Sequence, residues 1–133
     1  MFDELIKYRK NGHFFFKKGN SLLEVGKKVP DRPGVYYIMR LANGKADLVY
    51  IGKSGIKTRY VNENKSQLKQ SIVDQLGLVD MKMSETNIDG LDIYWFVTFD
   101  KDHHDLPDYL LGLIIQTYFD VYGRLPEWNE INS

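Results

Sequence analysis

Residues 34–53 read GVYYIMRLANGKADLVYIGK, and this stretch decides the fold. Its two ends, residues 34–40 and 48–53, are short runs of β-branched and aromatic residues, which are typical of strands. Between them lies Asn43-Gly44, a strong hairpin turn signal because both residues readily adopt the positive φ angles that tight turns require. The stretch therefore predicts an antiparallel β-hairpin.

The remaining chain predicts helices and one further strand. We expect helices over residues 2–10, 62–76 and 105–122, a strand over 91–99, and an irregular tail over 125–129. The strand is apolar on both faces and should be central. Apolar side chains surround the last helix almost completely, which predicts a core helix. The segment HFFFKK at 13–18 is aromatic and basic but suggests no element.

This element order predicts an α+β fold: a small central antiparallel sheet, formed by the hairpin plus a further strand, flanked by helices. A length of 133 residues fits one domain. We expect that domain to span residues 1–133, with a core over about 30–130 and an N-terminal extension over 1–29.

Composition narrows the classes of protein. Without cysteine, a disulfide framework, a thiolate zinc site and a cysteine nucleophile are excluded. The N-terminal MFDELIKYRK lacks the apolar region of a secretory signal, and no apolar stretch approaches the roughly 18 to 20 residues of a membrane helix. We therefore expect a cytoplasmic protein with no membrane partner. His103 and His104 lie beside acids, but adjacent residues converge poorly on a metal, so a loop-surface role is expected.

Charge is divided unevenly along the chain although the formal net charge is zero. Residues 1–69 hold 15 of the 18 Lys and Arg and 6 acids, a net +9; residues 70–133 hold 3 bases and 12 acids, a net −9. Such asymmetry can mark a face that binds polyanions. It can equally mean that the two halves attract each other in the fold.

The hairpin carries two related tripeptides, Gly34-Val35-Tyr36 and Tyr50-Ile51-Gly52. Lys53-Ser54-Gly55 follows the second, Arg59 opens the next segment, and Pro126-Glu127-Trp128-Asn129 ends the tail. Together these motifs resemble the GIY-YIG nuclease family, with valine in place of isoleucine in the first tripeptide. The resemblance spans roughly residues 30–130.

The resemblance implies metal-dependent hydrolysis of phosphodiester bonds in nucleic acid, with DNA as the expected partner, and a dependence on Mg²⁺ or Mn²⁺. Tyr36 and Tyr50 would bracket the attacking water, Arg59 would bind phosphate oxygens with its planar guanidinium, and Asn129 would brace the site. A phenol of pKa near ~10 is a poor base, so a nearby cation would have to lower its pKa. Lys53, Ser54 and Lys57 would contact the nucleic acid.

One position departs from the family pattern. The glutamate that holds the family's metal on the final helix corresponds to Leu111, and leucine cannot ligate a hard cation. Asp108, one turn earlier, and Glu63, where many members have histidine, are weak replacements. Three functions stay open: an active DNA endonuclease, a derivative that binds nucleic acid but cuts poorly or not at all, and an inactive scaffold for protein partners. The tyrosines, bases and Asn129 can also be read as ordinary strand, surface and turn residues.

Overall fold

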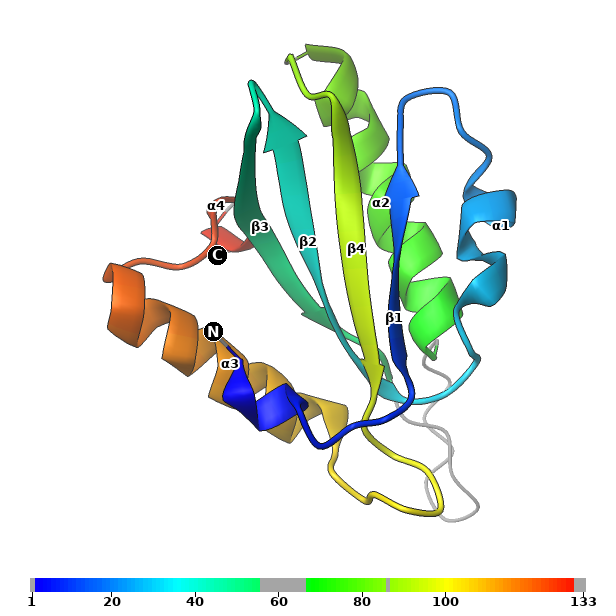
Figure 1. The fold of residues 1–133 in the computed structure, drawn as a ribbon, viewed down its shortest axis with the longest axis vertical. Coiled ribbons are helices and arrows are strands. Elements are labelled where there is room, and N and C mark those ends of the chain that lie inside the picture. Colours follow the sequence, from blue (N-terminus) through cyan, green and yellow to red (C-terminus); the bar gives the residue numbers. More distant parts are fainter. Residues whose placement is uncertain (1, 56–66, 86, 131–133) are drawn as a thin grey trace.

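The structure is a computed structural model that describes residues 2–55, 67–85 and 87–130. A four-stranded antiparallel sheet with strand order β1-β4-β2-β3 lies at its centre, and Figure 1 shows α2 on one side of it and α3 on the other. The strands are β1 (Asn11–Phe16), β2 (Gly34–Ala42), β3 (Lys45–Lys53) and β4 (Gly90–Val97). The helices are η1 (Asp3–Leu5), α1 (Leu22–Val25), η2 (Gly26–Lys28), α2 (Leu68–Glu85), α3 (Pro107–Tyr122) and α4 (Glu127–Glu130). The α+β fold class is confirmed.

The predicted hairpin is confirmed as β2 and β3. Its turn holds Asn43 at φ 54° and Gly44 at φ 73°, the left-handed backbone that the dipeptide was expected to supply. The register shifts between Ile38 and Met39, so that Val49 is an extra residue in β3 and forms a β-bulge. Beyond the bulge, towards the open end of the hairpin, Tyr36 lies opposite Gly52.

β4 is the predicted central strand, paired with β2 on one side and β1 on the other. β1 was not expected. The helix predicted over residues 2–10 is wrong, because only Asp3–Leu5 forms a single 3₁₀ turn and the chain then enters the sheet. Residues 1–29, expected as an extension, thus supply a strand and the buried residues Leu5, Tyr8 and Phe16.

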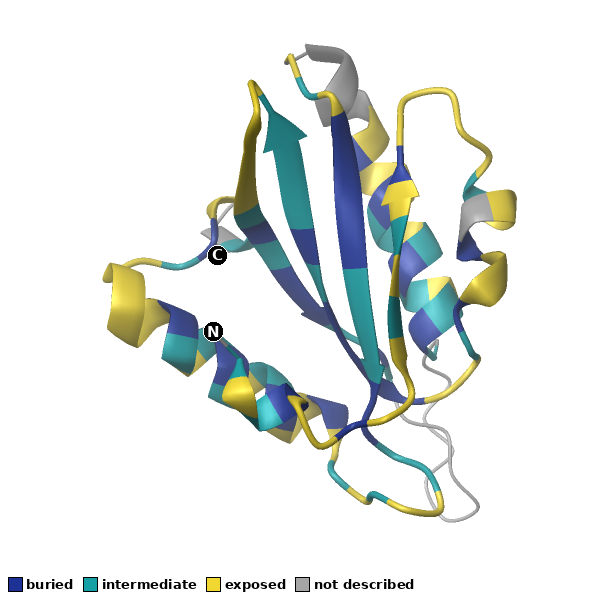
Figure 2. Cartoon of the chain, viewed as in Figure 1, coloured by how far each residue is buried: buried dark blue, intermediate teal, exposed yellow. Residues whose placement is uncertain are grey.

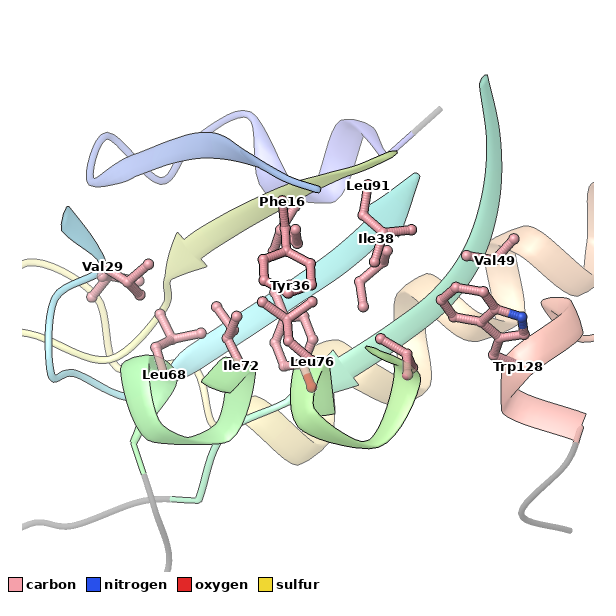
Figure 3. Packing of buried hydrophobic residues seen from close by; sticks show 13 residues of the cluster. Phe16, Val29, Tyr36, Ile38, Val49, Leu68, Ile72, Leu76, Leu91 and Trp128 are labelled. Atoms are coloured by element: carbon pink, nitrogen blue, oxygen red, sulfur yellow. The ribbon is translucent and has the colours of Figure 1, made fainter. Parts of the chain in front are cut away.

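Each face of the sheet has its own core. The α2-side core lies between the sheet and α2, and Figure 3 shows Tyr36 pointing from β2 into it. Its main buried members are Phe16, Tyr36, Ile38, Val49, Leu68, Ile72, Leu76, Leu91, Ile93, Val97 and Trp128. The α3-side core consists of Leu5, Tyr8, Val35, Ile51, Leu110, Ile114 and Tyr118. Neighbouring strand residues alternate between the two cores, as the pleat of a strand requires.

Three expectations about helices need correction. α3 is not a core helix: it buries one stripe, while Tyr109 is 61% and Phe119 45% exposed, because no described element covers its outer side. Figure 2 shows this alternation of buried and exposed positions along α3. α2 continues to Glu85, well past residue 76. The tail is not wholly irregular, since residues 127–130 form α4. None of the described helices combines the length and apolarity needed to cross a membrane.

Candidate functional site

Tyr36 and Tyr50 lie on adjacent antiparallel strands and meet on the α2 side of the sheet. Their ring centroids are 6.0 Å apart, with an angle of 43° between the ring planes. Gly52 makes room for them: a Cβ atom added there would lie 2.5 Å from the Tyr36 ring and 2.7 Å from the Tyr50 ring. Since real Cβ contacts are never so short, the second tripeptide needs its glycine for the first tyrosine to lie across β3.

Burial shapes the chemistry of this pair. Tyr36 is only 2% exposed, while Tyr50 is half-buried. Burial, and then the neighbouring Tyr50, raises the pKa of Tyr36 well above its usual value of 10. Burial also raises the pKa of Tyr50, and a side-chain hydrogen bond with Tyr36 partly opposes that rise. In this arrangement the pair can position and polarise a neighbour through hydrogen bonds, but neither phenol is a base near neutral pH.

Asn129 reaches the same strand from the opposite end of the sequence. Its Oδ1 accepts a hydrogen bond from the Ile51 amide at 2.9 Å, and its Nδ2 donates to the Ile51 carbonyl at 2.9 Å. Among the described strands β3 lies at the edge of the sheet, so no other described strand pairs with these backbone groups on that side. Asn129 therefore takes the place of a neighbouring strand and holds the Tyr50-Ile51-Gly52 tripeptide in position.

Ser54 and Lys53, expected to contact nucleic acid, are both engaged within the fold. Ser54 is 1% exposed; its hydroxyl accepts from the Gly34 amide at 2.8 Å and donates to the Gly55 carbonyl at 2.7 Å. Those bonds join the start of β2 to the end of β3. Lys53 Nζ lies 2.5 Å from Asp108 Oδ1, which connects the end of β3 to the first turn of α3.

The expected metal position falls on the other side of the sheet. Leu111 is partly buried against the α3-side core, which contains Val35 and Ile51, whereas Tyr36 belongs to the α2-side core. Asp108 is 73% exposed and paired with Lys53. Across the part of the chain that the structure describes, no three His, Asp or Glu side chains gather into a set that could hold a metal ion. Lys57, Arg59 and Glu63 lie outside the described residues.

The structure adds one polar pair that sequence reasoning did not find. His13 Nδ1 lies 2.9 Å from Asp92 Oδ1, and Asp92 is 6% exposed. The His13 ring also stacks on Tyr94, with centroids 4.9 Å apart and planes 8° apart. No local signal could have revealed this pair, because only the pairing of β1 with β4 brings together residues 79 positions apart. His103 and His104 lie in the loop before α3, where His103 contacts the Tyr8 ring.

Ion pairs within the fold account for part of the charge asymmetry between the two halves of the sequence. Three ion pairs between described side chains join a Lys or Arg of the first half to an acid of the second: Lys7–Asp105, Arg40–Glu127 and Lys53–Asp108. Attraction between the halves therefore accounts for part of the +9 and −9 division.

Comparison with protein-family models, with curated proteins and with solved structures gave no match to this chain.

Proposed function

We propose that this domain is a derivative of the GIY-YIG type that binds the backbone of nucleic acid and cleaves it weakly or not at all. The observation that supports the proposal most is the arrangement of Tyr36, Tyr50 and Gly52 on one hairpin, braced by Asn129. These are residues that the resemblance assigns to a single site, and they lie together although the last is far away in sequence.

Weak cleavage is inferred from three features of the chain. Leu111 offers no oxygen to a cation, and its side chain lies on the α3 side of the sheet. Asp108, the nearest carboxylate on α3, is already neutralised by Lys53. The pKa of Tyr36 is raised rather than lowered, which is the wrong direction for a base that must activate water at neutral pH. Mg²⁺ or Mn²⁺ would be needed only by an active form.

Binding is tested by fluorescence anisotropy with a labelled DNA duplex, its single strand and the matching RNA. We expect weak binding that falls steeply as salt rises, because neutralised phosphates release counterions. Arg59→Ala should weaken binding more than Lys10→Ala, a matched loss of one base at an exposed position of the N-terminal segment. Absence of binding at low ionic strength, or affinity that does not change with salt, would contradict the proposal.

Cleavage is tested on the same preparations by nicking of supercoiled plasmid with Mg²⁺ or Mn²⁺. We expect little or no cutting by the unaltered chain and no gain for Leu111→Glu, because a carboxylate at that position would lie on the α3 side of the sheet, away from the Tyr36–Tyr50 pair. Because Leu111 is only partly buried, the substitution should be tolerated. Efficient cutting by the unaltered chain that is lost in Asp108→Ala or Glu63→Ala would show that the site is a complete nuclease.

One observation favours a second candidate, an inactive scaffold for protein partners. Large apolar side chains are exposed along and beside α3: Leu106, Tyr109, Phe119, Val121 and Tyr122. Such a group of apolar side chains is a common feature of protein interfaces. If nucleic acid does not bind at any salt concentration, while Tyr109→Ser with Phe119→Ser abolishes self-association or partner capture, the scaffold function is the better account.

A further inference from the structure

A pocket of about 400 Å³ opens on the α3 side of the sheet, on the face opposite the Tyr36–Tyr50 pair. Residues from β2, β3 and the C-terminal part of α3 line it, together with Phe2 and the segment that leads into α4. Its volume lies within the range of roughly 300 to 1,000 Å³ that is typical of small-molecule sites. The pocket is therefore large enough for a small molecule, and this holds independently of the proposed function.

Aromatic rings supply much of the pocket wall. Phe2 and Tyr37 form one pair, with centroids 5.4 Å apart, and Tyr118 and Tyr122 form another at 4.6 Å. Leu48 contributes aliphatic surface between β3 and α3. Rings bury a large apolar area and favour offset or edge contacts with other rings. These rings offer surfaces against which a planar aromatic ligand can pack.

The charged groups of the pocket differ in whether they are already paired. Arg40 is held by Glu127, with Nη1 and Oε2 2.7 Å apart, and lies 3.9 Å from Asp47. The single charge of Arg40 is thus engaged by two carboxylates, chiefly that of Glu127. Arg124 is exposed, and among the described side chains it has no ion-pair partner. Arg124 is therefore the cation that remains to meet a ligand, and its planar guanidinium suits a carboxylate.

We propose that this pocket binds a small planar aromatic compound that carries one anionic group, with its ring system against the aromatic walls and the anion at Arg124. A divalent anion would fit less well, because Asp47 and Glu127 lie in the same wall. An aromatic cation would have to compete with Arg40, which lies 2.7 Å from Glu127 and 3.9 Å from Asp47.

The test is a heteronuclear NMR titration of the full ¹⁵N-labelled chain with 1-naphthoate and with 1-naphthamide, its uncharged counterpart. We expect saturable 1:1 binding of 1-naphthoate, with shift changes centred on Tyr37, Leu48 and Tyr122. Arg124→Gln should weaken the binding of 1-naphthoate by about fivefold, which is the contribution expected of a partly exposed ion pair. The affinity for 1-naphthamide should stay unchanged. Lys101→Gln removes an exposed base outside the pocket and should alter neither affinity.

A pair of steric variants separates the pocket from general surface binding. Ala46 is an exposed β3 residue that lines the pocket, and Lys45 is its exposed neighbour that does not. A strand surface tolerates aromatic residues, so both Ala46→Trp and Lys45→Trp should fold. Ala46→Trp should abolish binding and Lys45→Trp should retain it. No saturable binding, equal or tighter binding of 1-naphthylmethylammonium, or an affinity unmoved by Arg124→Gln and Ala46→Trp would each overturn the proposal.

Discussion

Asp105 joins the N-terminal segment to the loop that precedes α3. Its Oδ2 accepts a hydrogen bond from the Tyr8 hydroxyl at 2.5 Å and lies 3.0 Å from Lys7 Nζ. The hydrogen bond from Tyr8, followed by that from Lys7, lowers the pKa of the Asp105 carboxyl below its usual 3.8. Burial and the same hydrogen bond raise the pKa of Tyr8, which is fully buried. The ionised form of Asp105 is therefore the form that the fold stabilises.

This pair predicts a loss of stability in acid. A carboxyl whose pKa is lower when folded stabilises the fold above its unfolded pKa, about 3.9, and that stabilisation disappears as the pH falls through the folded pKa. At pH 7, Asp105→Asn should lower the free energy of unfolding by about 1–2 kcal/mol. This is the contribution of a charge-assisted hydrogen bond, reduced because Asp105 is partly exposed. Urea unfolding should show that the difference from the unaltered chain shrinks by pH 2.5.

Asp102→Asn is the matched control, since Asp102 is an exposed carboxylate in the same loop whose backbone amide, not its side chain, makes the hydrogen bond to Asp100. It should change stability little at either pH. A constant Asp105→Asn deficit from pH 7 to pH 2.5 would mean that packing, and not ionisation, explains the role of Asp105.

At the level of elements, a side chain forms backbone hydrogen bonds along the outer edge of β3. An edge strand exposes backbone groups that another chain could pair with, and Asn129 of α4 satisfies both groups of Ile51. The buried Trp128, next to it, anchors α4 in the α2-side core beside Val49, as Figure 3 shows. Packing by Trp128 and hydrogen bonding by Asn129 thus fix the end of the chain on the bulged part of β3.

Asn129→Ala should lower the free energy of unfolding by about 2 kcal/mol, because two hydrogen bonds to a partly buried backbone are lost. The stability of Asn129→Asp should depend on pH. An ionised carboxylate cannot donate to the Ile51 carbonyl and repels it, whereas a protonated carboxyl can donate a hydrogen bond to it. Since its folded pKa is then raised, the variant should be more stable, relative to the unaltered chain, at pH 3 than at pH 7.

Thermal unfolding monitored by circular dichroism measures both Asn129 variants. Asn20→Ala serves as the control, because Asn20 Oδ1 accepts one exposed backbone hydrogen bond in a surface turn, and its loss should cost well under the Asn129 value. Equal losses for Asn20→Ala and Asn129→Ala would contradict the role of Asn129 as a substitute strand.

At the scale of the whole molecule, β1 completes the sheet and adds Phe16 to the α2-side core, while Leu5 and Tyr8 of the preceding segment belong to the α3-side core. Phe16 is 1% exposed and belongs to the α2-side core, while its neighbour Phe15 is 55% exposed on the other face of the same strand. Both residues are phenylalanines in β1, so they differ chiefly in the face of the strand on which their side chains lie. They form a natural test of whether the N-terminal segment is part of the folding unit.

Phe16→Ala should lower the free energy of unfolding by about 3–4 kcal/mol, the cost of an aromatic cavity in a core. Phe15→Ala should cost less than about 1 kcal/mol, because most of its surface already contacts water. Chemical denaturation followed by Trp fluorescence would measure both. Similar small effects for the two variants would show that residues 11–16 are not held in the sheet.

Local sequence pattern correctly predicted that the hairpin, β4 and α3 exist. The signals were the Asn43-Gly44 turn, an apolar run, and a helix that begins at a proline and ends before a glycine, and each depends only on residues close in sequence. Local pattern misled at β1, where NGHFFF shows no clean alternation and becomes a strand only by pairing with β4. It also misled at α3, where apolar residues all round suggested burial that a single sheet face cannot provide.

For the candidate site, the sequence by itself determined which residue types are present: two tyrosines near a glycine, a terminal asparagine, and a leucine where a carboxylate was expected. Only the tertiary structure decided what they do. The bulge at Val49 and the space at Gly52 bring the tyrosine rings together, and burial raises the pKa of Tyr36. The packing of α3 on the opposite face of the sheet puts Leu111 and Tyr36 in different cores. The reason is physical: side-chain identity is local, whereas burial, face and distance depend on strands that are remote in sequence.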